Sequence, residues 1–341
     1  MQFHRRPQYS TNQPRRGLGS PSDPTVRKGR RASSRRGVGQ ALEARQSRQR
    51  AASTSCPLCN GPSHRVFAKW PYWIRDCEAC GHRFARIGQE ENHVEHVYSD
   101  DYFSGGETGY HDYLGEGELL VRQGRRYAGI LQRFLKPGSI LDVGSAAGFM
   151  LKGYEDAGWK ARGVEPNRRM AEYARSRLGL HVTTGTLEEL SHGEVYDVIS
   201  MIQVLAHFLD PRAALGMALK ITKPGGYWLI ESWNRNSWTT RMLGRYWHEY
   251  NPPSVLHWFS RRSLRRLLSE FGMQEVAHGW PLKWIHASHA KSAIRHSLES
   301  SRLGPLVTSV VRIIPDLFPL LYPGDDVCWS LYQRSPAGKS P

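Results

Sequence analysis

From residue 138 onward, short apolar runs alternate with segments whose apolar residues recur at helical spacing. Short runs bounded by turn residues predict buried strands, and the periodic segments between them predict helices. Strands are expected at residues 139–144, 160–166, 181–185, 196–201 and 226–232, and helices at about 148–157, 167–178, 187–191 and 211–222. This alternation is typical of a mostly parallel sheet with helices on both faces.

Turn and cap residues support these boundaries. Gly158 follows the first helix, where a left-handed residue is favoured, and residues 223–226 form the turn into the fifth strand. Ser260 is expected to cap a later amphipathic helix, and a further strand is expected at 326–334. The apolar stretch within 280–324 is interrupted by charged residues and proline, so it is expected to form a helical insertion over the site and not a membrane helix.

In such a sheet, ligands bind beyond the carboxyl ends of the strands, near the first crossover. The first strand runs into Gly144-Ser-Ala-Ala-Gly148, which lacks the second glycine of a pyrophosphate-binding loop. No Gly-Lys-Ser/Thr follows, which excludes a Walker loop. Glu165, at the end of the second strand and 23 residues after Asp142, suits hydrogen bonds to a ribose diol. A carboxylate that can bind the ribose hydroxyls, beside a loop that does not fit a diphosphate, indicates S-adenosylmethionine.

Four of the five cysteines form two C-x2-C pairs with 17 residues between them, namely Cys56 with Cys59 and Cys77 with Cys80. This spacing lets four thiolates reach one tetrahedral zinc ion at about 2.3 Å. A pair of disulfides is the alternative, but no secretory signal accompanies it. Residues 54–88 are therefore expected to form a zinc ribbon whose zinc is structural, because a closed shell leaves no position for substrate. His64 and His82 are expected at its surface, with replacement of one zinc ligand as the alternative.

Charge is concentrated at the amino-terminal end. Residues 1–55 contain 13 Lys/Arg and two acids, so they carry a net charge of +11 out of +16 for the chain. This segment lacks a periodic apolar face, and residues 1–53 are expected to be a disordered basic tail. It could attract nucleic acid or anionic lipid weakly, although a solvated tail is the favoured interpretation. The absence of a signal peptide and of a long apolar run predicts a cytoplasmic protein without a membrane span.

Residues 139–233 resemble the core of class I S-adenosylmethionine-dependent methyltransferases. The matching segments are "ILDVGSAAGFML", "GVEPN", "GTLEEL", "YDVISMIQVLAHFLDP" and "KPGGYWLIES". The later "RYWHEYNPPSVLHWFSRRSLRRLLSEFG" resembles a bacterial subgroup whose members include sugar C-methyltransferases, several with an N-terminal zinc ribbon. The resemblance extends over about 55–335 and implies a Rossmann-like, seven-stranded, mostly parallel α/β sheet.

The resemblance also implies roles for individual positions around S-adenosylmethionine. Gly144, Ser145 and Gly148 would wrap the methionine portion, and Asp142 would orient its ammonium through water. Glu165 would hold the ribose, and Thr186 and Leu187 would flank adenine. Gln203 would face the sulfonium, and Tyr102 or Tyr110 would close the pocket. Ordinary turn chemistry is the alternative for Asp142 and Thr186, and small size alone could explain Ser145. Plain aromatic packing is the alternative for Tyr102 and Tyr110.

A base is needed where the methyl acceptor must lose a proton. Candidates after the fifth strand are His248, Glu249, Tyr250 and His257. Related enzymes read P-P-x-H-L here, whereas this chain has Val255 at the histidine position and His257 two residues later, on the same face of an extended segment. His207, after the fourth strand, is a further candidate. The catalytic candidates are thus His257, His207 and Glu249, with a packing role as the alternative for His257.

The expected organisation is a tail at 1–53, a zinc ribbon at 54–88, a Tyr/Gly-rich lead-in at 89–137, and a methyltransferase core at 138–336 that carries the insertion. The favoured function is methylation of a small molecule, such as a nucleotide-activated sugar or a secondary metabolite. An RNA methyltransferase that grips RNA with ribbon and tail is an alternative. A non-catalytic zinc-ribbon protein with a degenerate methyltransferase fold is another. The sequence leaves the oligomeric state open.

Overall fold

The computed structural model describes residues 55–88, 93–103, 112–190, 193–281, 283–287, 291, 315, 319–322 and 324–335. Residues Ala52–Pro341 form one compact unit. The expected basic tail at 1–53 lies outside the described residues. Within the described ranges, every helix is too short or too polar to span a bilayer.

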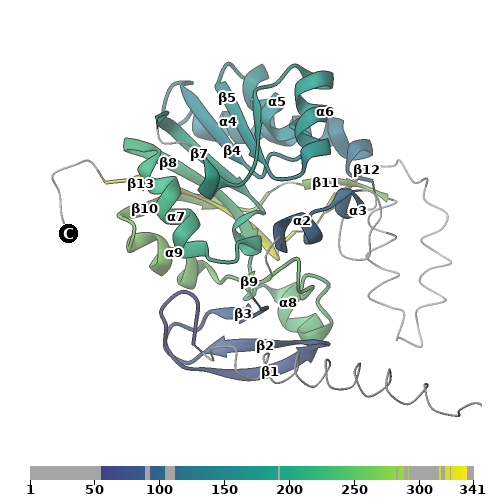
Figure 1. Ribbon diagram of the computed structural model, residues 1–341, viewed down its shortest axis with the longest axis vertical. Helices are drawn as coiled ribbons and strands as arrows, with labels where there is room; N and C mark the ends of the chain where they lie inside the picture. Colours follow the sequence, from purple (N-terminus) through teal and green to yellow (C-terminus); the bar gives the residue numbers. More distant parts are fainter. Residues whose placement is uncertain are drawn as a thin grey trace, which may run out of the picture. The chain divides into compact units, whose positions relative to one another are not determined.

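The central sheet has seven strands in the order β10-β13-β8-β7-β4-β5-β6 (Figure 1). Their bounds are β4 Ser139–Val143, β5 Lys160–Glu165, β6 Val182–Thr184, β7 Tyr196–Ile202, β8 Thr222–Trp233, β10 Met273–Gly279 and β13 Val327–Arg334. The strands from β8 to β6 are parallel, and β13 is antiparallel to both of its neighbours. The predicted mostly parallel α/β sheet is confirmed, and every strand expected from the sequence is present.

Helices cover both faces of this sheet, with α4, α5 and α6 over one face and α7 and α9 over the other (Figure 1). They span α4 Gly117–Leu131, α5 Phe149–Asp156, α6 Arg168–Leu178, α7 Pro211–Lys220 and α9 Arg261–Ser269. Side chains of Asn167, Asp210 and Ser260 accept hydrogen bonds from first-turn amides of α6, α7 and α9, which is why these helices begin there. Gly158 has φ +88°, as its predicted position after a helix requires.

Shorter elements lie between the main ones. They are α2 His93–Val97, α3 Asp100–Phe103, η1 Leu114–Glu116, η2 Leu187–Glu189, η3 Leu205–His207, α8 Trp238–Leu243 and η4 Gly244–Tyr246. The helix predicted at 187–191 is only the single turn η2. In the predicted insertion at 280–324, β11 Lys283–His286 pairs antiparallel with β12 Pro319–Tyr322, and most of the remainder lies outside the described residues.

The cysteine-rich segment folds as an antiparallel sheet that continues into the core. Strands β1 Ser63–Lys69, β2 Tyr72–Cys77 and β3 Arg83–Ala85 are joined by β9 His257–Trp258, in the order β1-β2-β3-β9. Phe67 and Ile74 pack against the core aromatics Tyr250 and Trp258. The fourth strand of the ribbon sheet is thus supplied by a segment that lies 172 residues after β3 in the sequence.

Ion pairs reinforce this junction. The Arg83 guanidinium donates two 2.7 Å hydrogen bonds to the Asp76 carboxylate and one to the Tyr250 hydroxyl. Arg235, which follows β8, donates to the same carboxylate and to the Gly81 carbonyl. The two arginines hold the pKa of Asp76 below its usual range even though burial acts in the opposite direction.

Two glycines allow α4 and α5 to touch through their backbones, which sets the position of the α4 side chains beside the sheet. A Cβ at Gly124 would lie 2.4 Å from the Met150 carbonyl oxygen, and a Cβ at Gly153 would lie 2.4 Å from the Val121 carbonyl oxygen. Gly129, one turn further along α4, has nothing within 4 Å of the same position.

We predict opposite effects of alanine at Gly124 and at Gly129 of α4. Gly124→Ala should lower the free energy of unfolding by about 2–3 kcal/mol, because the helices must separate. Gly129→Ala should raise it by up to about 1 kcal/mol, because alanine has the higher helix propensity. Denaturant titration of both variants measures this, and equal effects would contradict the close contact between α4 and α5.

Candidate cofactor site

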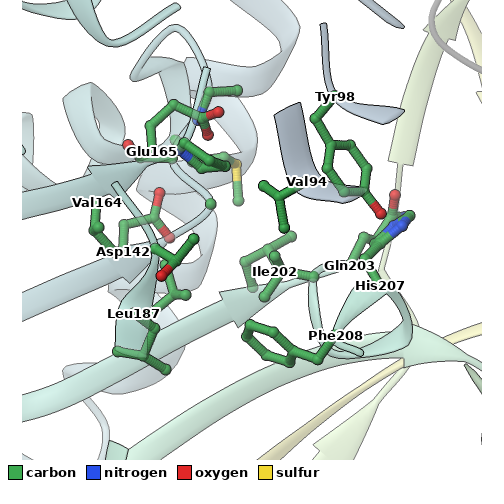
Figure 2. A pocket seen from close by; sticks show the side chains of 18 of the residues that line it. Val94, Tyr98, Asp142, Val164, Glu165, Leu187, Ile202, Gln203, His207 and Phe208 are labelled. Atoms are coloured by element: carbon green, nitrogen blue, oxygen red, sulfur yellow. The ribbon is translucent and has the colours of Figure 1, made fainter. Parts of the chain in front are cut away.

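A cavity of about 350 Å³ opens at the carboxyl ends of β4, β5, β7 and β8. Figure 2 shows Asp142 and Glu165 on one side of it and Tyr98, Gln203 and His207 on the other. Aromatic side chains from the segments before the core close much of the remaining wall, namely Tyr98, Tyr102, Phe103 and Tyr113. The volume is that of a small-molecule site, and the position at the first crossover is the one predicted.

The loop after β4 turns sharply away from the sheet. Gly144 and Ser145 donate their amides to the Val164 carbonyl, and Gly144, Ala146 and Gly148 all have positive φ. Gly144 and Ser145 line the cavity. Gly148 is not among the described lining residues; it starts α5, where a Cβ would meet Leu180 and Ala174.

Ser145 contributes to the loop by being small. A Cβ on the β5 residue Gly163 would lie 2.6 Å from the Ser145 Oγ and 2.9 Å from its Cβ. The buried hydroxyl has no hydrogen-bond partner in the described part of the chain. The side chain therefore packs against β5 at Gly163.

Glu165 is fixed by the same loop. One carboxylate oxygen accepts from the Ala146 amide at 2.8 Å, and the other accepts from the Asn167 amide at 2.7 Å. Burial raises the pKa of Glu165 to about 7, although both amide bonds act in the opposite direction. Each oxygen keeps a lone pair for a further donor, so the group can accept two hydroxyls from the cavity.

Asp142 lies one strand away and is also buried. Burial raises its pKa to about 7, with a hydrogen bond from Ser200 opposing the shift and the Glu165 charge adding to it. Thr186 and Leu187 line the cavity at the start of η2, where the Thr186 amide donates to Glu189. The predicted positions 142, 165, 186 and 187 are thus brought together around one cavity.

Gln203 follows β7 and points to a carboxylate that the sequence analysis did not single out. It has φ +57°, and its Nε2 donates to Oε1 of Glu231 at 2.7 Å. The Tyr127 hydroxyl of α4 donates to the other oxygen of Glu231. Both Gln203 and Glu231 line the cavity. The signal in the sequence was an acid inside the apolar run "GYWLIES" of the fifth strand.

His207 lies in the cavity wall with its ring orientation fixed. Its Nδ1 is 2.6 Å from the Ser254 carbonyl oxygen, which also accepts from the Tyr98 hydroxyl at 2.8 Å. A carbonyl only accepts, so the Nδ1 atom carries the proton and Nε2 is the basic nitrogen of the neutral ring. Burial lowers the pKa of His207, which keeps the ring neutral at physiological pH.

The other two predicted bases lie elsewhere. His257 is on β9, with Nδ1 3.1 Å from His82 Nε2 and Nε2 2.9 Å from the Phe208 carbonyl oxygen. Burial lowers its pKa to about 4. Glu249 pairs with His248 at 2.9 Å. Neither His257 nor Glu249 is among the described lining residues of the cavity.

Two further expectations can be compared with the structure. His82, expected at the surface, is buried because it packs between His257, Phe84 and Phe259. Tyr102 lines the cavity, whereas Tyr110 lies outside the described residues.

The four predicted metal ligands converge at the end of the ribbon hairpin. The sulfur atoms of Cys56, Cys59, Cys77 and Cys80 all lie within 4.8 Å of one another, and none is in a disulfide. Cys56 and Cys80 are 3.6 Å apart, and Cys59 and Cys77 are 3.4 Å apart. These separations are close to the edge of about 3.8 Å that a tetrahedron with 2.3 Å Zn–S bonds requires. Backbone amides of Leu58 and Cys80 point to two of the sulfurs.

Comparison with known proteins places the core in a family. Residues 120–278 match the family model described as a methyltransferase domain. A ubiquinone biosynthesis O-methyltransferase of Bradyrhizobium sp. is 28% identical over 127 residues, which cover 36% of this chain and 48% of that protein. The corresponding protein of Azoarcus sp. is 24% identical over 186 residues, covering 48% and 78%. The chain spans about half the length of the first of these curated relatives.

The chain is also similar to solved structures at lower sequence identity. A magnesium protoporphyrin IX methyltransferase from Synechocystis is 12% identical with a TM-score of 0.43, covering 65% of this chain and 85% of that one. A SAM-dependent methyltransferase from Archaeoglobus fulgidus is 17% identical with a TM-score of 0.44, covering 64% and 94%. The domain match over residues 120–278 and the seven-stranded sheet support a class I S-adenosylmethionine-dependent methyltransferase.

Proposed function

We propose that the protein transfers the methyl group of S-adenosylmethionine to a small-molecule acceptor. The charge of the cavity carries this proposal. Within the described ranges, four carboxylates line the cavity (Asp142, Glu165, Glu188 and Glu231), and no lysine or arginine does. Such a lining repels the phosphates of a dinucleotide and suits a cofactor that carries a sulfonium and an ammonium.

The described residues fit the parts of this cofactor. Glu165 offers a fixed carboxylate to the ribose diol, and Asp142 lies where the ammonium would need a counter-charge. The tight turn at Gly144 and Ser145 leaves room for the methionine chain, and Leu187 offers an apolar contact for adenine. When bound, the cofactor supplies an electrophilic methyl group for in-line displacement.

The relatives support an acceptor with a hydroxyl group, since they are named as O-methyltransferases. His207 is placed to serve such an acceptor. Its Nδ1–H is held by the Ser254 carbonyl, so Nε2 can take the hydroxyl proton as the oxygen attacks. Tyr98 and Phe208 beside it provide aromatic surface against which a planar acceptor can pack.

We expect titration calorimetry to detect S-adenosylmethionine binding, and Glu165→Ala to weaken it at least tenfold. The loss of a charged acceptor for two hydroxyls accounts for this size. Glu172→Ala, on the exposed face of α6, is the control and should leave the dissociation constant unchanged. An unmodified protein that gives no binding, or equal affinities for both variants, would contradict the proposed cofactor site.

Binding should also depend on pH. Asp142 and Glu165 have pKa values of about 7 in the free protein, and a bound cation favours their ionised forms. Below pH 7 these carboxylates must release protons on binding, so affinity should fall as the pH decreases, by up to about tenfold per pH unit for each group. Calorimetry between about pH 5 and 6.5, where the cofactor ammonium remains charged, measures the slope. Asp142→Asn should make it shallower; affinity that rises on acidification would contradict this assignment.

We further propose that the four cysteines bind one structural zinc ion. Elemental analysis should find about one zinc per chain in the purified protein, and Cys59→Ser should lose most of it and lower the melting temperature. Cys328→Ser is the matched control, because this cysteine is remote from the cluster in the described structure and should leave the zinc content unchanged. Purified protein without zinc would exclude the metal.

A further inference from the structure

Glu231 is a buried carboxylate that the proposed cofactor contacts leave without a role. Its exposed fraction is 2%, and it borders the cavity from the tenth of the twelve residues of the long strand β8. Within the described part of the chain, no lysine, arginine or histidine forms an ion pair with it. A carboxylate is costly to bury without a counter-charge, which makes a functional role worth seeking.

Two neutral donors fix its position. The Gln203 amide donates to one oxygen, and the Tyr127 hydroxyl donates to the other. The backbone adds a third restraint, since the Gln203 amide N–H donates to the Glu231 carbonyl. Glu231 therefore cannot swing away from the cavity, yet its charge is not neutralised by these partners.

The acids form a row across the carboxyl edge of the sheet. Glu165 ends β5, Asp142 lies on the neighbouring β4, and Glu231 lies on β8, opposite Ile202 of β7. Glu165 and Asp142 are used by the ribose and the ammonium in the proposed function. Glu231 is on the far side, beside Gln203, and a sulfonium is the remaining positive charge of the cofactor.

We propose that Glu231 recognises the sulfonium charge and so makes the site prefer the methyl donor to the demethylated product. This inference rests on the proposed function. When the methyl group moves to the acceptor, the sulfur becomes a neutral thioether, and the attraction to Glu231 disappears. The fixed carboxylate then favours exchange of S-adenosylhomocysteine for fresh S-adenosylmethionine.

The test compares three ligands that share adenine, ribose and the amino-acid end. S-adenosylmethionine carries a sulfonium, sinefungin carries an amine cation at the same place, and S-adenosylhomocysteine is neutral there. In Glu231→Gln, calorimetry should show about tenfold weaker binding of both cationic ligands and less than twofold change for S-adenosylhomocysteine. Equal losses for all three ligands would overturn the proposal.

Tyr127→Phe keeps the charge of Glu231 and removes one of its two side-chain donors, while the Gln203 donor and the backbone contact remain. It should therefore change the ratio of affinities for S-adenosylmethionine and S-adenosylhomocysteine by less than Glu231→Gln does; a shift as large as that of Glu231→Gln would assign the effect to structure and overturn the proposal. The Glu165→Ala variant separates this inference from the proposed function, because loss of a ribose contact should weaken all three ligands alike. Strong binding of all three with no effect of Glu231→Gln would refute the inference alone.

Discussion

The backbone of residues 254–258 holds the ribbon and the cavity wall together. The Leu256 carbonyl accepts from Ala85 at the end of the ribbon strand β3, while the Leu256 amide donates to Ala206 in η3. Two residues earlier, the Ser254 carbonyl fixes His207 and Tyr98. The ring of His207 therefore has the correct tautomer only while this segment stays in place. The ribbon, which pairs with the segment through β9, acts as a brace for the cavity wall.

Through this connection the four-cysteine cluster supports the cavity wall, although the cysteines are not among the described residues that line the cavity. The His82 ring, two residues after Cys80, contacts His257, and His257 contacts the Phe208 carbonyl in the cavity wall. The proposed zinc, bound by the four cysteines, would fix the turn that carries His82, because the Cys77 amide also donates to the His82 carbonyl. A rigid ribbon thus limits movement of Phe208.

Two carboxyl groups in the cavity lower the stability of the folded protein. Asp142 and Glu165 have folded pKa values of about 7, above the values near 4 of an unfolded chain. A raised carboxyl pKa means that the unfolded state loses its proton first, so these groups lower stability as the pH rises from about 4 to 7. Sites that carry such a cost are usually functional, because the same carboxylates would be replaced if stability alone were selected.

The elements that the sequence predicted well are those governed by local signals. Caps such as Ser260, and the spacing of the cysteines, depend on residues close together in the chain, and Asp142, Glu165 and Gln203 sit at strand ends that a parallel sheet must bring to one edge. Contacts across long separations were not accessible. His257 was correctly expected in an extended segment, but its partner His82 is 175 residues away, and that contact turns its ring from the cavity toward the ribbon.

The two halves of the cavity also differ in this way: one is built from neighbouring strand ends and the other from segments far apart in the sequence. The cofactor half is built from strand ends, where a change in one side chain disturbs the sheet that supports its neighbours. The opposite wall combines Tyr98, His207 and Ser254 from three distant segments that meet at a single carbonyl oxygen. Side chains can change around that carbonyl while its hydrogen bonds keep the wall in place. The fold can therefore hold one cofactor constant while its acceptor varies, and in the proposed function the acceptor is selected by the wall that the ribbon braces.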